Sequence, residues 1–220
     1  MAPAASFPCY TPAEQALDRA LHVFAVLLAA GGVAWLLFAV APAGGVRQLI
    51  GLTVYGAGLI GMFVASAAYN SCRPCRAKEL LRRVDHAMIF VMIAGTCTPF
   101  ALLAFPESIG LLISAVIWIS AAAGAVLKLA FPRRLERLLL ALYLAMGWTM
   151  FAASQRYAGS LSHGVLLLLF GGGLAYSCGA CVQARGRFRF HNVAWHGLVL
   201  LGAGLHWIAV ADQVVIRRGL

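Results

Sequence analysis

The stretch SAAYNSCRPCRAKELLRRVDHAMIFVMIAGTCTPF, residues 66–100, decides how this chain folds. An apolar run ends within it at Ser66 and Asn70, a short basic loop follows, and a second apolar run opens at Asp85-His86. Polar side chains therefore lie where two hydrophobic segments reach the same edge of a membrane. We expect any chemistry inside the membrane to take place near this edge.

The composition of the whole chain indicates lipid rather than water as its solvent. Its 220 residues are 62% hydrophobic and only 11% charged, whereas a soluble domain averages about 25% charged residues. Seven runs without Asp, Glu, Lys or Arg reach or nearly reach the roughly 17–25 residues that a helix needs to span the hydrocarbon. These runs are residues 20–46, 48–72, 86–106, 108–127, 138–155, 157–184 and 190–211. Since lipid leaves open backbone groups unsatisfied, the predicted fold class is all-α, a seven-transmembrane-helix bundle.

The division of the chain follows from these runs. We predict an irregular N-terminal arm over residues 1–18 and one seven-helix transmembrane domain over residues 19–220. The first helix is predicted over residues 17–40 and the third over residues 85–105, with a separate turn at the membrane surface over residues 78–83. No cleavable signal peptide is expected, because the first apolar run is long enough to span the membrane.

Basic residues are distributed unevenly over the predicted loops. If the seven spans alternate in direction, thirteen of the seventeen Lys and Arg residues fall on the face that holds the N-terminus, and four fall on the other. The positive-inside rule then predicts a cytoplasmic N-terminus and a periplasmic C-terminus in a bacterial inner membrane. The net charge of +10 is interpreted as a topology signal, so the expected partners are membrane lipids and not nucleic acid.

Polar side chains from three predicted helices are expected to meet just inside the cytoplasmic face. Ser66 and Asn70 lie four residues apart at the end of the second span and share a helix face. Asn192 and His196 do the same at the start of the seventh span. Asp85 is predicted at a helix start, where the macrodipole favours a carboxylate. Because ionisable groups inside membranes are functional candidates, these residues predict a polar cavity.

A serine, an aspartate and a histidine around one cavity indicate metal-assisted hydrolysis. An open zinc site has three protein ligands and a water, and Asp85 would order that water. Only His196 is a good zinc ligand, because the amides of Asn70 and Asn192 bind zinc poorly. Two interpretations therefore stay open: a cluster that retains a metal, and a metal-free, hydrogen-bonded plug or ligand pocket.

Several segments resemble the hemolysin III family, which belongs with the adiponectin and progestin receptor-like membrane proteins and is related to alkaline ceramidases. These segments are SAAYN (66–70), RRVDHAMIFVMIAGTCTPF (82–100), YLAMGW (143–148), LLLLFGGGLAYSCGA (166–180) and NVAWHGLVLLGAGLHW (192–207). The resemblance implies seven transmembrane helices with the N-terminus inside the cell.

The resemblance also implies a zinc ion, held by one histidine at the end of the second helix and two at the start of the seventh. Ser66 and Asp85 match a serine and an aspartate that accompany this ion in the family, and His196 matches the last histidine. Asn70 and Asn192 stand at the other two ligand positions.

Further residues are candidates for the same region. Five are predicted to line the cavity: His22, His86, Tyr143, Tyr176 and His206. Two Cys-x-x-Cys pairs, Cys72/Cys75 and Cys178/Cys181, match a zinc spacing. We interpret the second pair as small hydrophobic residues of a helix and do not expect a four-thiolate site.

The sequence thus predicts a lipid-related membrane protein with a cytoplasm-facing polar cavity among the second, third and seventh helices. Its hydrolase-like site is altered. If it still cleaves lipid amides or esters, His196 would hold metal, Asp85 would orient water and Ser66 would hydrogen-bond the developing oxyanion. Two alternatives remain: a non-catalytic receptor or scaffold that binds a lipid ligand in the cavity, and a pore-forming protein.

Overall fold

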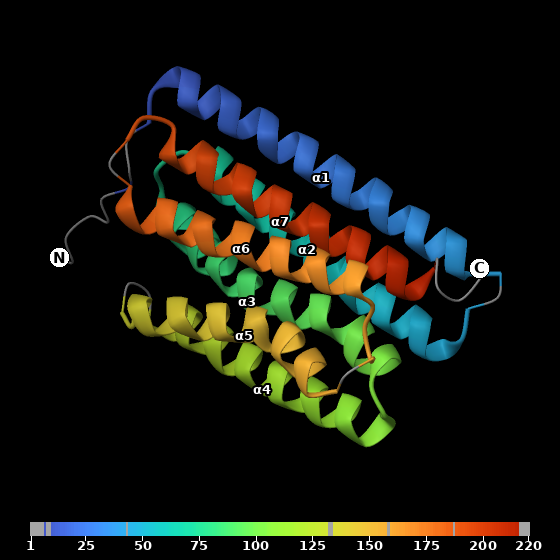
Figure 1. Ribbon diagram of the computed structural model, residues 1–220. Helices are drawn as coiled ribbons and strands as arrows, with labels where there is room; N and C mark the ends of the chain where they lie inside the picture. Colours follow the sequence, from blue (N-terminus) through green and yellow to red (C-terminus); the bar gives the residue numbers. More distant parts are fainter. Residues whose placement is uncertain are drawn as a thin grey trace.

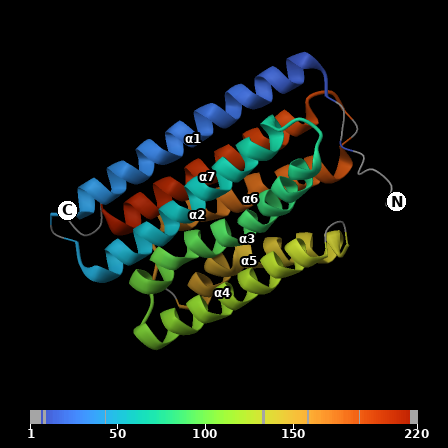
Figure 2. The same ribbon diagram turned by 180° about the vertical axis from the view of Figure 1, so that it is seen from behind.

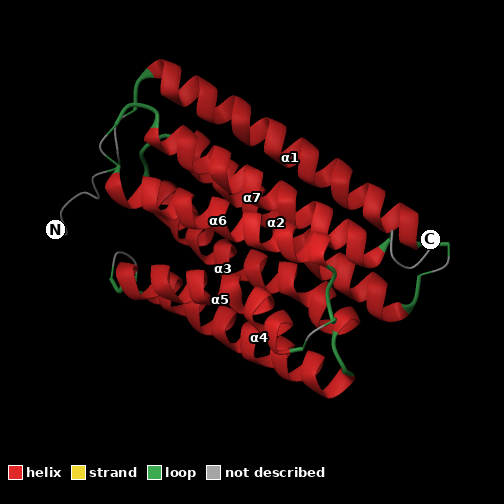
Figure 3. Cartoon of the chain, viewed as in Figure 1, coloured by secondary structure: helices red, strands yellow, loops and turns green. Residues whose placement is uncertain are grey.

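The computed structural model describes residues 7, 10–42, 44–131, 134–157, 159–186 and 188–215, and these residues form seven α-helices and no strand (Figures 1 and 3). The helices are α1 (Pro12–Val40), α2 (Val46–Ser71), α3 (Arg76–Ala104), α4 (Glu107–Ala130), α5 (Glu136–Arg156), α6 (His163–Arg185) and α7 (His191–Val214). Each is long and apolar enough to cross a membrane. The predicted all-α class with seven membrane-spanning helices is confirmed.

The helices form one bundle in which each runs opposite to its predecessor (Figures 1 and 2). The closest pairs are α2 with α3, α6 with α7, and α3 with α4. α1 lies along one side of the bundle against α2 and α7, and α4 and α5 lie on the opposite side. As a result, α1, α2, α3 and α7 surround a common region near the end at which α1, α3 and α7 begin.

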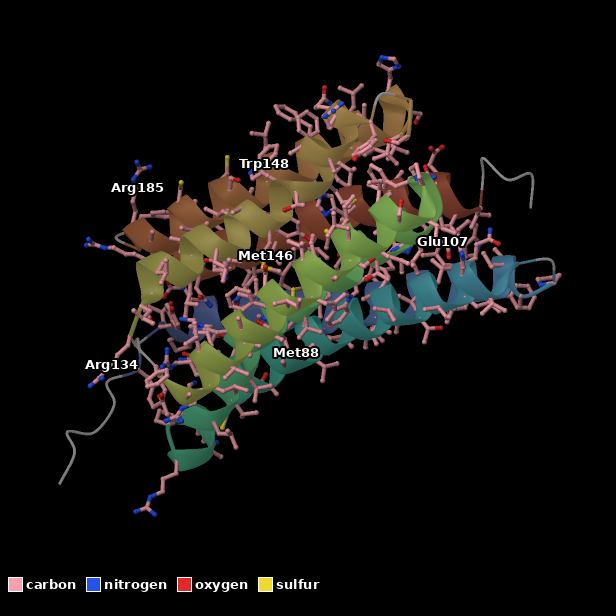
Figure 4. All side chains as sticks on the ribbon, turned by 90° about the horizontal axis from the view of Figure 1, so that it is seen from below. Met88, Glu107, Arg134, Met146, Trp148 and Arg185 are labelled. Atoms are coloured by element: carbon pink, nitrogen blue, oxygen red, sulfur yellow. The ribbon has the colours of Figure 1, made fainter. Side chains whose placement is uncertain are left out.

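We call this end of the bundle the basic end. The described Lys and Arg residues at or near it are Arg19, Arg73, Arg76, Lys78, Arg82, Arg83, Lys128, Arg134, Arg137, Arg185 and Arg189. Figure 4 labels Arg134 and Arg185 at this end and Glu107 at the opposite end. Four arginines that entered the charge count, Arg133, Arg187, Arg217 and Arg218, lie outside the described residues.

The outer surface of the bundle is apolar, as lipid requires. Phe38 on α1 and Leu167 on α6 are 81% and 73% exposed, and Ile119 on α4 is 70% exposed. In water such exposed apolar side chains would be unfavourable, but against acyl chains they have no cost. The charged residues of the described chain lie at the helix ends or inside the bundle.

α1 begins five residues earlier than the sequence predicts. Thr11 caps it, Pro12 occupies the first turn, and Glu14 completes a capping box with Thr11. This arrangement satisfies backbone N–H groups that a helix start otherwise leaves open. The prediction of an irregular chain up to residue 18 was therefore wrong for residues 12–18, which are helical.

α3 also begins earlier, at Arg76 rather than Asp85. The basic segment predicted as a separate surface turn is its first part, where Arg82 pairs with Glu79 at 3.0 Å. Asp85 consequently lies about two and a half turns inside the helix. The macrodipole falls off within the first turn, so the expectation that it stabilises Asp85 was wrong.

Glycines bring α2 and α3 into near backbone contact. A Cβ atom on Gly58 would lie 3.3 Å from the Met92 Cα atom, and one on Gly95 would lie 3.1 Å from the Val54 carbonyl oxygen. Small residues of this kind allow membrane helices to approach closely. The contact fixes the polar end of α2 beside the first half of α3.

Candidate functional site

A cavity of about 1280 Å³ reaches from the basic end into the bundle. Exposed residues such as Arg19 and Arg73 border it at the surface, and Phe100 and His206 line it in the interior. From Asp85 to Phe100 the wall of α3 runs about 22 Å at 1.5 Å per residue. The cavity therefore joins the charged end of the bundle to its apolar middle.

The structure places every site residue named from the sequence on the wall of this cavity. These residues are Ser66, Asn70, Asp85, Asn192, His196, His22, His86, Tyr143, Tyr176 and His206. They come from α1, α5 and α6 as well as from the three helices expected to enclose the site. Their chemical roles stay predictions.

Asp18 also lines the cavity, although it is not among the site residues predicted from the sequence. The buried residues of α1 start with Glu14, Asp18 and His22 and continue with Ala25 and Ala29. Steps of three and four residues define one helix face. The sequence contained a signal for Asp18, because Asp18 and His22 continue the helix face that carries Ala25 and Ala29, each by one turn towards the N-terminus. Asp18 is 6% exposed and His22 is 4% exposed.

Glu14 holds the start of α1 against the start of α7. Its Oε1 atom accepts the Phe190 N–H at 2.8 Å, and its Oε2 atom accepts the Thr11 N–H at 2.8 Å. Phe190 has a φ of 63° and ends the turn that leads into α7. One turn further along α1, Asp18 consequently faces the first turns of α7.

Asp18 contacts His196 directly. The Oδ1 atom of Asp18 lies 2.6 Å from Nδ1 of His196, and both side chains are about nine-tenths buried, at 9% and 11% exposure. A carboxylate only accepts hydrogen bonds, so Nδ1 of His196 carries the hydrogen. Nε2 of the neutral ring then keeps its lone pair, which is the state in which histidine binds metals.

His22 joins Asp18 to Ser66. Its Nδ1 atom lies 2.7 Å from the Asp18 carbonyl oxygen and 3.5 Å from the Asp18 Oδ2 atom. Because the carbonyl accepts, Nδ1 donates, and in the neutral ring Nε2 accepts from the Ser66 hydroxyl at 3.1 Å. The ring centroids of His22 and His196 are 4.4 Å apart. The two imidazoles and the carboxylate thus form one contiguous group.

Ser66 lies among three polar neighbours. Besides His22, the Asn70 amide donates to the Ser66 carbonyl oxygen at 3.0 Å and reaches the Ser66 Oγ atom at 3.4 Å. The Asp85 carboxyl interacts with the Ser66 side chain and is close enough to His196 for electrostatic interaction. The hydroxyl is therefore positioned from α1, α2 and α3 together.

The residues at the three ligand positions that the family resemblance implies do not fit a zinc ion. Asn70 and Asn192 offer amides, and the Asn70 amide nitrogen is directed at Ser66. A different set does fit. Within the described part of the chain, the His, Cys, Asp and Glu residues close enough to share an ion are Asp18, His22 and His196, whose ligand atoms lie within 4.8 Å of one another.

The two cysteine pairs do not assemble into a metal-ligand group among the described residues. Cys72 and Cys75 form a local pair with their Sγ atoms 3.7 Å apart. Cys178 and Cys181 are exposed on α6. Both lie within the apolar helix α6, as predicted, with their side chains on its outer surface.

Two of the deeper cavity residues differ in how their polar atoms are satisfied. Nε2 of His206 lies 3.3 Å from the Leu169 carbonyl oxygen, a structural hydrogen bond between α6 and α7. The Tyr176 hydroxyl, whose ring is 5.3 Å from that of His206, is buried without a hydrogen-bond partner in the described structure. A buried unpaired hydroxyl has a free-energy cost, so this atom is available to a molecule in the cavity.

Seven membrane-spanning helices around a polar cavity define a multi-pass α-helical membrane protein with a buried Asp–His–His–Ser cluster. The family model described as "Haemolysin-III related" matches residues 12–207. The chain belongs to this family, as its sequence motifs predict.

Two bacterial relatives match almost end to end. The chain is 31% identical over 201 residues to "Hemolysin-3 homolog" of Bacillus subtilis (strain 168), covering 91% of this chain and 94% of the relative. It is 29% identical over 203 residues to "Hemolysin-3" of Bacillus cereus, covering 92% of each chain. No solved structure matches the chain.

Proposed function

We propose that this protein hydrolyses an ester or amide bond of a membrane lipid in a cavity that opens to the cytoplasm of a bacterial cell. The observation that carries the proposal is a chain of hydrogen bonds from Ser66 through His22 to the backbone carbonyl of Asp18, with Asp85 beside it, all on the wall of one cavity. The cytoplasmic opening is inferred from the basic residues at that end, and the inner membrane from this orientation and the bacterial relatives.

The cavity suits an amphiphile. Beyond the polar cluster its wall is formed by apolar side chains, among them Met62, Phe63, Met92, Phe100 and Leu169. At about 1280 Å³ it exceeds the roughly 300–1,000 Å³ of sites for drug-sized ligands. A lipid with its head near Ser66 and its chain toward Phe100 would match this gradient, and Tyr176 offers a donor along the chain.

The polar cluster supplies the groups that hydrolysis needs. A base must take a proton from water, and a donor must stabilise the oxyanion. We assign the first role to Asp85, which lies beside Ser66, and the second to the Ser66 hydroxyl. That hydroxyl now donates to His22, and the carbonyl oxygen of a bound lipid would compete for the same hydrogen.

The proposal is tested by turnover of defined lipids. Purified protein in vesicles is incubated with ester lipids and with N-acyl sphingoid lipids, and released fatty acid is measured by mass spectrometry. Asp85→Asn should lower turnover by roughly 10²–10⁴-fold, the range of general-base catalysis. Ser66→Ala should also lower turnover.

Ser177→Ala is the matched control, because Ser177 lines the cavity but bonds to the carbonyl of its own helix at 2.7 Å. This variant should turn over lipid like the unmodified protein. Absence of any release above empty vesicles, or full activity of Asp85→Asn, would contradict the hydrolase proposal. Lipid binding without turnover would instead favour a receptor.

The names of the two relatives favour membrane permeabilisation as a second candidate function. Vesicles that contain a self-quenched dye distinguish the two. A pore releases the dye at once and regardless of Asp85→Asn, whereas a hydrolase releases it only as cleaved lipid accumulates.

A further inference from the structure

We infer that Asp18, His22 and His196 bind one divalent metal ion of the zinc type, with ligands from α1 and α7 in place of the family pattern on α2 and α7. The inference names the cofactor of the site proposed above, and the catalytic meaning of the ion rests on that proposed function. The binding of the ion itself does not depend on any substrate.

The donor set selects the class of metal. Two imidazoles and one carboxylate are the ligands of a common type of catalytic zinc site, which leaves a further position for water. Magnesium and calcium prefer oxygen ligands, whereas imidazole nitrogens suit zinc and similar transition metals. The group on α1 and α7 therefore has the ligands of an open zinc site. The family positions, which hold two amides and one imidazole, do not.

The distances are close to those of a metal site. Asp18 Oδ1 lies 2.6 Å from His196 Nδ1, and Asp18 Oδ2 lies 3.5 Å from His22 Nδ1. Zinc bonds of about 2.0–2.2 Å place tetrahedral ligand atoms roughly 3.4 Å apart. The contact between Asp18 and His196 would thus widen by less than about 1 Å. Because the two Nδ1 atoms would bind the ion, each ring would then carry its hydrogen on Nε2.

The surroundings of the group hold its members in place. Glu14 fastens the first turn of α1 to Phe190 at the entry to α7, which sets the register of Asp18 against His196. Ser66 lies at hydrogen-bonding distance from His22. Outer contacts of this kind orient metal ligands and typically change metal affinity about 10- to 100-fold.

Charge also favours a cation at this place. The carboxyl groups of Asp18 and Asp85 line the same cavity and act on each other electrostatically. Arg82, one turn before Asp85, acts on Asp85 as a positive charge. A divalent ion between Asp18 and the two imidazoles would offset the negative charges of both the Asp18 and the Asp85 carboxylates. Unpaired charges are costly inside the membrane.

The chemistry that such an ion supplies is polarisation of a carbonyl and acidification of bound water. The residues of the chain have the remaining tasks. Asp85 receives a proton, and Ser66 donates to the oxygen that becomes negative. Variants of the three metal ligands should therefore lose the ion, whereas a variant of Asp85 should lose lipid turnover and keep the ion.

The inference is tested by metal content without a substrate. The full-length protein is purified in detergent without chelators, dialysed against limiting zinc, and analysed by plasma mass spectrometry. We expect about one zinc per chain. Asp18→Asn, His22→Gln and His196→Gln should each reduce this by at least tenfold. Asn70→Ala and Asn192→Ala should retain it, as should His86→Gln, a cavity histidine outside the group.

Cobalt binding to the unmodified protein tests the inference even if a variant does not fold. Addition of Co²⁺ to metal-free unmodified protein should produce visible absorption bands of a four- or five-coordinate site and should raise the Tm. Unmodified protein without zinc and without a cobalt spectrum would overturn the inference. Full metal content in Asp18→Asn and His22→Gln, combined with loss in Asn70→Ala, would overturn it as well.

The two proposals fail in distinguishable ways. Asp85→Asn should retain zinc and the cobalt spectrum but lose lipid turnover. Bound metal without turnover of any lipid would contradict only the hydrolase proposal, whereas turnover by a protein that binds neither zinc nor cobalt would contradict only the metal site.

Discussion

Glu14 is a residue with two tasks, because it caps α1 through Thr11 and binds the backbone N–H that precedes α7. Replacement by glutamine weakens charge-assisted hydrogen bonds and loosens the register of Asp18 against His196. We predict that Glu14→Gln lowers the Tm in detergent and weakens zinc affinity roughly tenfold, the size of an outer-contact effect.

Glu107→Gln is the control for this prediction. Glu107 is also an acidic residue in the first turn of a helix, but it is exposed and lies at the opposite end of the bundle. The zinc affinity of the Glu107→Gln protein should equal that of the unmodified protein. Equal affinities of all three proteins would show that Glu14 does not position the site.

Cys75 is predicted to be the more reactive thiol of the local cysteine pair. The Lys78 backbone N–H and the Cys72 side chain hold the pKa of Cys75 below its usual value, while burial raises the pKa of Cys72. Thiolate is the reactive form, so iodoacetamide should label Cys75 faster than Cys72 near pH 7. The rates should converge above the ordinary thiol pKa of about 9, which peptide mass spectrometry measures. Faster labelling of Cys72 near pH 7 would contradict this.

Among elements, the α2–α3 contact sets the position of Ser66 relative to Asp85. A leucine at Gly58 or Gly95 would meet backbone atoms of the facing helix within 3.3 Å. Overpacking of this kind costs about 1–3 kcal/mol and can cost more, so Gly58→Leu and Gly95→Leu should lower the Tm clearly. Gly31→Leu is the control, because a Cβ there meets nothing within 4 Å. Equal Tm values for all three variants would contradict the close packing.

The starts of α1 and α3 show how far the sequence determines the fold. Charge-free runs located all seven helices, because the cost of charge in hydrocarbon is large. They placed the starts of α1 and α3 too late, because a helix continues into the polar membrane boundary where caps and ion pairs such as Arg82–Glu79 support it. The runs mark the extent of the hydrocarbon rather than the ends of the helices.

The site could be predicted to a similar extent. Spacing along single helices brought Ser66 and His196 to the correct end, since the four-residue period is local. Asp18 was missed because it falls at the predicted boundary between the irregular arm and the first helix, which left its helix face undefined. Its contact with His196 joins residues 178 positions apart and depends on how α1 packs against α7, which a single sequence does not reveal.

At the scale of the whole molecule, the proposed cytoplasmic opening of the cavity requires the basic end to face the cytoplasm. Basic loops are retained on that side during insertion. A C-terminal alkaline phosphatase fusion should therefore be active and a C-terminal green fluorescent protein fusion dark, whereas an N-terminal green fluorescent protein fusion should fluoresce. The reverse pattern would place the cavity mouth in the periplasm and contradict the proposed cytoplasmic opening.

The inferred metal site joins α1 and α7 at Asp18, His22 and His196. It is tested most directly by crystals of the zinc-loaded protein, with diffraction recorded on both sides of the zinc absorption edge. An ion bound there gives an anomalous difference peak between these three side chains, at bonding distances of about 2.0–2.2 Å. A peak beside Asn70 and Asn192 without Asp18 and His22, or no peak in the cavity, would contradict it.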